Sequence, residues 1–254
     1  MIINESELYP FVTSDFSDRD CLVLAPHPDD ESIGCGGSII KHLKKGSRVR
    51  VIFLTSGDKG DFEGVFGGEY KDFRRECALK ALKALGVDDY EFWDFADREV
   101  SREADKAYLK LKKQVEAFKP GLIYVPSPYE AHPDHKASAL MGWKVFREMK
   151  VPVAFYEVLM PLYPNVLVDI SKEMPQKESA IRHYSTELYY NDYVYRVEGL
   201  NRFRTATLSP ETKYAEAFFL LTETVVSGND MSYMLLRRFY EPVPFWKRVF
   251  RNDR

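Results

Sequence analysis

The sequence predicts an α/β fold: a Rossmann-like, mostly parallel sheet flanked by helices, with a C-terminal cap region. Short apolar runs rich in β-branched residues alternate with amphipathic stretches through the first half of the chain, as in repeated strand–helix–strand units. These runs are continuous rather than alternating with polar residues, which is typical of strands buried on both faces. The connections are short, so successive strands are expected to lie in one sheet.

The first half supplies the parallel part of this sheet. Its predicted strands cover residues 21–25, 48–54, 91–95 and 122–125. Its predicted helices cover residues 38–45, 71–85 and 102–118. Gly46 and Gly86 follow the first two helices directly, where a helix C-cap favours glycine. In the third helix we expect the apolar side chains to face inward, namely Leu109, Leu111, Val115 and Phe118.

The second half is less regular, because prolines at positions 161, 164, 175 and 210 interrupt it. Predicted strands cover residues 153–159, 165–170 and 214–221, and a predicted helix covers residues 172–183. We interpret this half as a cap over the sheet rather than as a second domain. The prediction is therefore one domain over residues 1–254, with a core of about residues 20–221 and a C-terminal extension over residues 222–254.

Charge and composition exclude several functional classes. The chain has 36 Lys and Arg against 39 Asp and Glu, so it lacks the basic field that holds nucleic-acid phosphates. No apolar run reaches the ~18–20 residues that span a bilayer, and the first residues do not form a secretory signal. Three cysteines cannot all pair within one chain, which favours a reducing compartment. We expect a cytoplasmic protein with no nucleic-acid partner.

Two polar clusters follow predicted strands, at the edge where parallel sheets bind ligands. The first, A-P-H-P-D-D-E, spans residues 25–31, and the second, A-H-P-D-H, spans residues 131–135. Three of the five histidines lie in these clusters: His27, His132 and His135. Histidine and carboxylate together suit Zn²⁺ or a similar divalent ion, and a catalytic zinc site takes three protein ligands and leaves one position for water.

We interpret His27, Asp30 and His135 as the metal ligands. Asp29 and His132 then lie beside the ion without binding it. A carboxylate in that place can act as general base on water, and a histidine can donate to a developing oxyanion. Asp134 would hold His132 protonated and oriented. As an alternative, Asp134 caps a helix that begins at His135.

Three other interpretations fit parts of these clusters. A single His-Pro-Asp-Asp turn is often only a solvated loop with a helix cap, but two such clusters at strand ends are rarely accidental. A structural zinc site normally takes four Cys or His ligands, whereas Cys21 and Cys77 are expected in a strand and on a helix. A dinucleotide-binding turn needs its third glycine at position 39, where Ile39 stands. The small residues at 34–37 are therefore expected to let a helix pack closely on the sheet.

Both polar clusters belong to longer motifs that resemble those of a known protein family. The sequence P-H-P-D-D-E-S-x-G-x-G-G at residues 26–37, followed by A-H-P-D-H-x-A at residues 131–137, resembles the LmbE-like, or PIG-L, family of zinc-dependent N-acetylglucosaminyl deacetylases. Corroborating matches are T-S-G-D-K-G at 55–60, L-G-V at 85–87, K-x-x-A-I-x-x-Y-S at 177–185 and Y-A-E-A-F at 214–218. The resemblance covers about residues 20–221. It implies a bound Zn²⁺ (or another divalent ion) and hydrolysis of an acetamide on an amino-sugar-containing small molecule or glycoconjugate.

The resemblance also assigns roles to single residues. It gives the metal triad as His27, Asp30 and His135, the general base as Asp29, and the oxyanion-stabilising histidine as His132 with Asp134 behind it. The candidate substrate-binding residues are Arg74, Asp97 and Glu31. The sequence departs from the family pattern at Cys77, where the family usually has Glu three residues after the arginine. Glu76 cannot take its place, because one helix position rotates a side chain by about 100°.

Further segments are candidates for contacts with substrate or partners. Aromatic side chains commonly flank sugars, so Trp93, Tyr129 and the tyrosines at 184–195 are candidates. The glycine-rich segment 61–70 is either a lid over the substrate or a surface loop. Residues 245–254 interleave aromatic and basic side chains. They allow peripheral membrane contact, or else pack on the domain or on a partner subunit of a homo-oligomer.

Two other functions compete with N-deacetylation. One is a metallohydrolase of the same fold that acts on another amide or on an ester. The other is a catalytically silent protein that only binds a metal or a sugar. Asp29 argues against the silent protein, because binding alone does not need a base.

Overall fold

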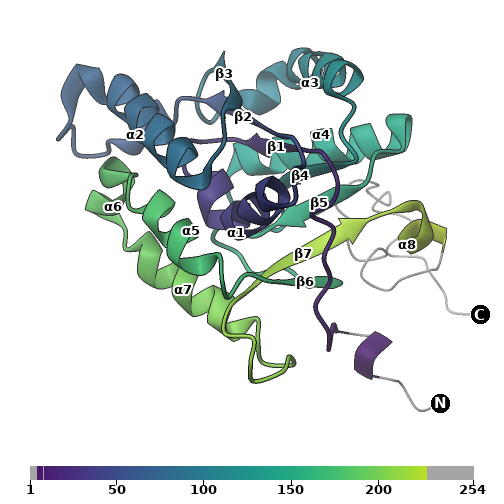
Figure 1. Cartoon of the computed structure of the whole chain (residues 1–254). Coiled ribbons are helices and arrows are strands. Elements are labelled where there is room, and N and C mark those ends of the chain that lie inside the picture. Colours follow the sequence, from purple (N-terminus) through teal and green to yellow (C-terminus); the bar gives the residue numbers. More distant parts are fainter. Residues whose placement is uncertain (1–4, 8, 228–254) are drawn as a thin grey trace, which may run out of the picture.

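A single seven-stranded sheet forms the centre of the protein, and its order is β3-β2-β1-β4-β5-β7-β6 (Figure 1). The computed structural model describes residues 5–7 and 9–227. The strands are β1 (Cys21–Ala25), β2 (Val49–Thr55), β3 (Asp89–Phe95), β4 (Leu122–Pro126), β5 (Val153–Tyr156), β6 (Val166–Asp169) and β7 (Ala215–Leu221). Strands β1 to β5 are parallel, and β7 is antiparallel to both of its neighbours. The predicted mostly parallel α/β fold is therefore confirmed.

Helices cover both faces of the sheet, and an apolar cluster fills the space between the helices and the strands on each face. They are α1 (Asp30–Lys44), α2 (Tyr70–Leu85), α3 (Ala104–Phe118), α4 (Pro133–Met149), α5 (Met174–Ile181), α6 (Ser185–Tyr190), α7 (Tyr193–Phe203) and α8 (Glu223–Ser227). Helices α3 and α4 pack on one face, and α1, α2 and α5 pack together on the other (Figure 1). Short 3₁₀ turns are η1 (Glu5–Glu7), η2 (Asp58–Gly60), η3 (Gly67–Glu69) and η4 (Val100–Glu103).

The direction in which the strand order grows reverses between β1 and β4, and this reversal positions the functional site. From β1 the chain builds outward through β2 and β3, and it then returns to place β4 and β5 on the other side of β1. Crevices open at such points, beyond the carboxyl ends of the two strands. The predicted polar clusters at 25–31 and 131–135 follow β1 and β4, so the fold brings both clusters to this crevice.

Helix α1 begins earlier than the predicted helix at 38–45, which covers only its second part. The backbone is non-helical at Cys35 (φ −142°, ψ 20°), so the helix is broken there. The new helix start after this break needs acceptors for its free N–H groups. Glu216 on β7 supplies them, because its carboxylate accepts the N–H groups of Gly37 and Ser38, each at 2.8 Å. The buried Lys177 pairs with the same carboxylate at 2.7 Å.

The small residues of α1 allow close packing, as predicted. A Cβ at Gly34 would overlap the ring of Tyr156 on β5, and a Cβ at Gly37 would lie 2.6 Å from Ile170. Glycine at these positions therefore lets α1 approach the sheet and bring its first turn to the crevice.

One predicted core residue is wrong. Leu109 on α3 is 59% exposed, whereas Leu111, Val115 and Phe118 are buried as expected. Two helix positions rotate a side chain by about 200°, so Leu109 and Leu111 cannot share a face.

The interpretation of residues 153–221 as a cap also needs revision, because β5, β6 and β7 join the central sheet.

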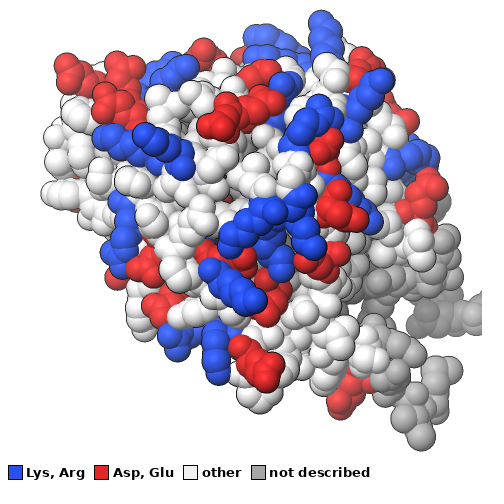
Figure 2. All heavy atoms as spheres, viewed as in Figure 1, with Lys and Arg blue, Asp and Glu red and all other residues white. Residues whose placement is uncertain are grey.

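Charged side chains of both signs cover the surface of the protein in the view of Figure 2. Figure 2 shows Lys and Arg interspersed with Asp and Glu on the visible face. Within residues 5–7 and 9–227, no helix combines the length and the apolar character that crossing a bilayer requires. Residues 245–254, which we considered for membrane or subunit contact, lie outside the described part of the chain.

Candidate active site

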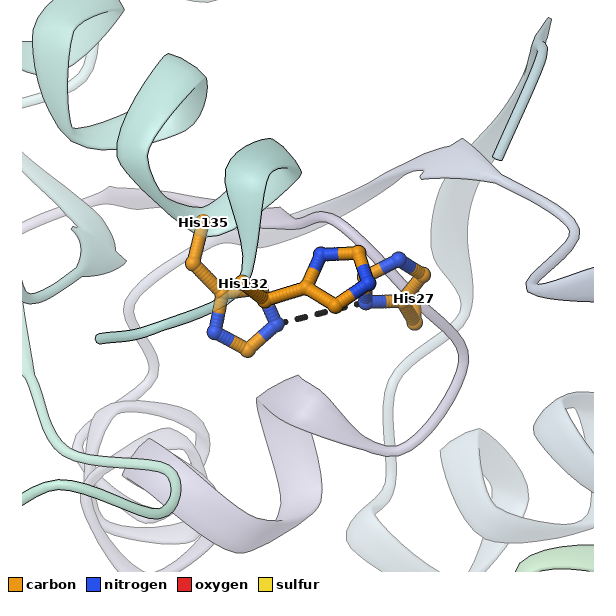
Figure 3. A group of neighbouring side chains, drawn as sticks. All are labelled: His27, His132 and His135. Atoms are coloured by element: carbon orange, nitrogen blue, oxygen red, sulfur yellow. Dashed lines mark hydrogen bonds between the residues drawn. The ribbon is translucent and has the colours of Figure 1, made fainter. Parts of the chain in front are cut away.

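Two loops that lie more than a hundred positions apart in the chain meet at the crevice. His27 lies in the turn between β1 and α1, while His132 caps α4 and His135 lies in its first turn. Figure 3 shows the three imidazoles side by side, with His27 and His135 joined through ring nitrogens. Pro133 at the first position of α4 has no N–H to satisfy, which suits a helix start.

Three ligand-type atoms of these loops form a nearly equilateral triangle. His27 Nδ1 lies 3.3 Å from Asp30 Oδ2 and 3.3 Å from His135 Nε2, and these last two atoms are also 3.3 Å apart. Zinc bonds to nitrogen and oxygen are about 2.0–2.2 Å long, so a tetrahedral ion separates its ligands by about 3.3–3.5 Å. The donor set and its spacing therefore fit a tetrahedral divalent cation with one further position.

The outer nitrogens of both histidines face buried carboxylates. His27 Nε2 lies 3.3 Å from Asp97 Oδ1 and 3.4 Å from Asp134 Oδ2, and His135 Nδ1 lies 3.7 Å from Glu130 Oε2. Burial alone lowers the pKa of a histidine, but these carboxylates and Asp30 raise the pKa of His27 well above its usual value and that of His135 to about 9. The surroundings thus favour positive charge at this point of the structure.

A second grouping of possible ligands lies on the other side of His27. It contains His27, Asp97, His132 and Asp134, and a third set combines the three histidines alone. However, the carboxylate of Asp134 accepts the N–H groups of Arg98 (2.7 Å) and Val100 (3.1 Å). Asp97 accepts the N–H of Lys59 at 3.0 Å. These carboxylates are committed to the backbone, as expected of groups that orient a ligand histidine rather than bind the ion.

Asp29 has an unusual backbone conformation for a non-glycine residue, with φ 134° and ψ −31°. Glu31 holds it there, because the Glu31 carboxylate accepts the N–H of Asp29 at 3.2 Å. Strained backbone of this kind is retained where the surroundings impose it, and it is concentrated at functional sites. Burial and the neighbouring charge of Asp30 raise the pKa of Asp29 well above its usual value, which suits a group that takes up a proton.

His132 has a defined tautomer. Its Nδ1 accepts the N–H of Asp134 at 3.3 Å, so a neutral ring carries its hydrogen on Nε2. Burial and the positive charges of His27 and His135 lower the pKa of His132 to about 4, which differs from the expected protonated form. The Asp134 carboxylate lies 4.0 Å from His132 Nδ1, and the backbone N–H of Asp134 makes the closer contact with the ring. His132 itself is the helix cap, so the alternative cap role of Asp134 is also wrong.

Arg74 is anchored from four directions. Its guanidinium donates to the carbonyl oxygens of Gly57 (2.9 Å) and Pro28 (2.6 Å) and lies 3.6 Å from Asp29 Oδ2. Its Nε lies 3.0 Å from Oε1 of Glu187 on α6. Glu187 thus supplies the carboxylate that Cys77 does not, and it was not among the predicted site residues. No local pattern signals it, because the two residues are more than a hundred positions apart.

A cavity of about 230 Å³ opens over these groups. Its lining includes all of the predicted site residues except Glu31 and Asp134, together with Glu187, Phe62, Tyr70, Tyr190 and Tyr193. Glu31, a predicted substrate-binding residue, is fully buried behind Asp29 and does not line the cavity. Its carboxylate accepts a hydrogen bond from the Tyr184 hydroxyl instead. The candidate aromatic residues Trp93 and Tyr129 do not line this cavity either, because both lie in the cluster under α3 and α4.

Comparison with known proteins identifies relatives of this architecture. Residues 22–146 match the family model PIG-L, described as GlcNAc-PI de-N-acetylase. The chain is 30% identical over 201 residues to the diacetylchitobiose deacetylase of Thermococcus kodakarensis, an alignment covering 69% of this chain and 73% of that protein. It is 24% identical to a 1D-myo-inositol 2-acetamido-2-deoxy-alpha-D-glucopyranoside deacetylase of a Mycobacterium species, and that alignment covers 88% of this chain and 80% of that protein.

The fold also matches a solved structure. The N,N'-diacetylchitobiose deacetylase of Pyrococcus horikoshii superimposes with a TM-score of 0.70, covering 91% of this chain and 89% of that chain at 23% identity. At this identity the match concerns the fold alone. It extends beyond residues 22–146, so most of the second half of the chain also follows the architecture of that protein.

Proposed function

This chain belongs to the PIG-L family of metal-dependent N-deacetylases, and from that membership and the geometry of its cavity we propose that it removes the acetyl group from an N-acetylated amino sugar. The proposed substrate is an N-acetylglucosamine-type small molecule or glycoconjugate, and the proposed metal is zinc. Relatives named as deacetylases of such compounds support the substrate class.

The observation that carries the proposal is the triangle of His27 Nδ1, Asp30 Oδ2 and His135 Nε2, with three sides of 3.3 Å. We propose these three residues as the zinc ligands. Both histidines have a carboxylate facing the other ring nitrogen, as is common for zinc-bound imidazoles. When bound, zinc supplies a Lewis acid for the acetamide carbonyl and makes a water acidic enough to attack near neutral pH.

The remaining steps are proposed for residues of the chain itself. Asp29 takes a proton from the attacking water and returns a proton to the departing amine, which its raised pKa favours. His132 donates its Nε2 hydrogen to the developing oxyanion, and it can do so while neutral. Arg74 and Asp97 line the cavity and are proposed to bind sugar hydroxyls.

Acetate release tests the proposal. The purified protein is loaded with zinc and incubated with N-acetylglucosamine, diacetylchitobiose and N-acetylglucosamine glycosides, and released acetate is measured. We expect release that a chelator abolishes and added zinc restores. Asp29→Asn is the matched negative control, since it should retain zinc. The proposal fails if the zinc-loaded protein releases no acetate from any N-acetylated amino sugar, or if release persists without metal.

A further inference from the structure

Glu130 lies in the loop after β4, where its side chain faces both His135 and the loop after β5. It is 1% exposed, and it does not line the cavity. A carboxylate so deeply buried is costly unless its oxygens are hydrogen-bonded or paired. Both carboxylate oxygens of Glu130 are therefore expected to have partners.

One oxygen holds a wall of the cavity. Oε1 accepts the N–H groups of three successive residues, Val158 at 2.8 Å, Leu159 at 3.0 Å and Met160 at 3.1 Å. Successive N–H groups pointing at one point form an anion-binding nest. Val158 and Leu159 line the cavity, so the Glu130 carboxylate fixes this part of its wall.

The other oxygen faces a proposed zinc ligand. Oε2 lies 3.7 Å from Nδ1 of His135, a buried nitrogen without a hydrogen-bond partner among the described residues. If Nε2 of His135 binds an ion, the hydrogen of the neutral ring must sit on Nδ1. A small movement of the ring then allows Nδ1–H to donate to Glu130.

We propose that Glu130 is a positioning residue that orients His135 for metal binding and ties this ligand to the 158–160 wall of the substrate cavity. This inference rests on the proposed function. It predicts that metal affinity and the position of the wall depend on one carboxylate.

Replacement by glutamine separates the two roles. In Glu130→Gln the amide oxygen can still accept the three N–H groups of 158–160, but the amide nitrogen, a donor, then faces His135 Nδ1. We expect the zinc dissociation constant, measured by competition with a chromophoric chelator, to rise about 10–100-fold. Hydrogen exchange of the 158–160 amides should stay slow. Glu130→Ala should weaken zinc binding and also speed exchange at 158–160.

A matched control is Glu173→Gln, which makes the same change at another buried carboxylate. Glu173 pairs with Lys44, the last residue of α1, whereas Asp30 of the proposed zinc site is the first residue of that helix. It should leave the zinc affinity unchanged. The inference is overturned if Glu130→Gln binds zinc as tightly as the unmodified chain. Failure of the unmodified chain to bind zinc would instead overturn the proposed function.

A measurement on the unmodified protein guards against a variant that fails to fold. In the zinc-loaded chain, the His135 Nδ1 hydrogen should give a slowly exchanging NMR signal, because it is buried and donated to Glu130. The inference would be contradicted if the Nδ1 hydrogen of His135 exchanged rapidly with solvent, or if Nδ1 carried no hydrogen in the zinc-loaded protein.

Discussion

The Nε atom of Arg74 lies 3.0 Å from Oε1 of Glu187, and this buried ion pair joins α2 to α6 across the cavity. Tyr70 donates to the same Oε1 at 3.2 Å, and Thr186 donates to Oε2 at 2.6 Å. The pair fixes the plane of the Arg74 guanidinium beside Asp29. Within one helix, an arginine and a glutamate can form such a pair when they are three or four positions apart. Here α2 provides the arginine and α6 provides the glutamate.

Glu187→Gln should therefore disturb substrate binding. The neutral amide no longer balances the charge of Arg74, and removing one partner of a buried ion pair costs about 3–5 kcal/mol. We expect KM to rise by about tenfold or more, with a smaller change in kcat, since Glu187 is not proposed to touch the reacting atoms. Glu76→Gln on the exposed face of α2 is the control and should leave both constants unchanged. Equal kinetics for Glu187→Gln and the unmodified chain would exclude this role.

Asp29→Asn tests the general base. The amide cannot take a proton from water, so kcat should fall about 10²–10⁴-fold, while bound zinc, measured by elemental analysis, stays stoichiometric. The N–H of residue 29 can still donate to Glu31, so the turn should keep its shape. A fully active, zinc-loaded Asp29→Asn variant would contradict the assignment.

His135→Ala and His132→Ala distinguish the possible ligand sets. The proposed triangle contains His135 but not His132, whereas each of the alternative groups of neighbouring ligands contains His132. His135→Ala should lose zinc after dialysis. His132→Ala should keep it and lose turnover about 10²–10³-fold, as for removal of an oxyanion donor. Loss of zinc from His132→Ala would favour the alternative sets.

Tyr190→Phe should loosen the segment at 61–70. The Tyr190 hydroxyl donates to Asp61 at 2.7 Å, and the same carboxylate accepts the N–H groups of Val65 and Phe66. Without the hydroxyl, we expect faster hydrogen exchange at the amides of 65 and 66 and a higher KM, because Phe62 of this segment lines the cavity. Tyr189→Phe, at an exposed neighbour, is the control. Unchanged exchange would show that Asp61 holds the segment alone.

His42 predicts how stability depends on pH. Its Nδ1 donates to the Arg19 carbonyl at 2.8 Å, and in the neutral ring Nε2 accepts from the Tyr124 hydroxyl at 2.9 Å, so the neutral ring satisfies both partners. Burial lowers the pKa of His42 despite opposing effects of the Arg19 carbonyl and the nearby Asp15 and Asp18. Below about pH 6.5 the unfolded chain then binds a proton that the folded chain does not. The contribution of His42 is present above that pH and is lost as the pH falls toward the lowered pKa.

The measurement compares the unmodified chain with His42→Asn, whose amide can still donate to the Arg19 carbonyl. The difference in free energy of unfolding between the two should shrink as the pH falls below about 6.5, by at most about 1.4 kcal/mol per pH unit. A difference that does not change with pH would show that His42 is not the group responsible.

The sequence alone determined the layout of the site. Residue order and apolar runs predicted β1 and β4, and each is followed by a histidine–aspartate cluster. Such features depend on neighbours along the chain, because apolar runs, prolines and helix-capping residues are local properties of a sequence. The predicted triad of His27, Asp30 and His135 needed only the expectation that parallel strands end at the same edge of the sheet.

The tertiary structure decided which partner each side chain meets. It paired Arg74 with Glu187, turned Asp134 toward the backbone at 98–100 and placed Glu130 between His135 and the loop after β5. It also buried Glu31 behind Asp29. These contacts join segments whose separation is fixed by helix and sheet packing over the whole domain, and no periodicity within one segment carries that information.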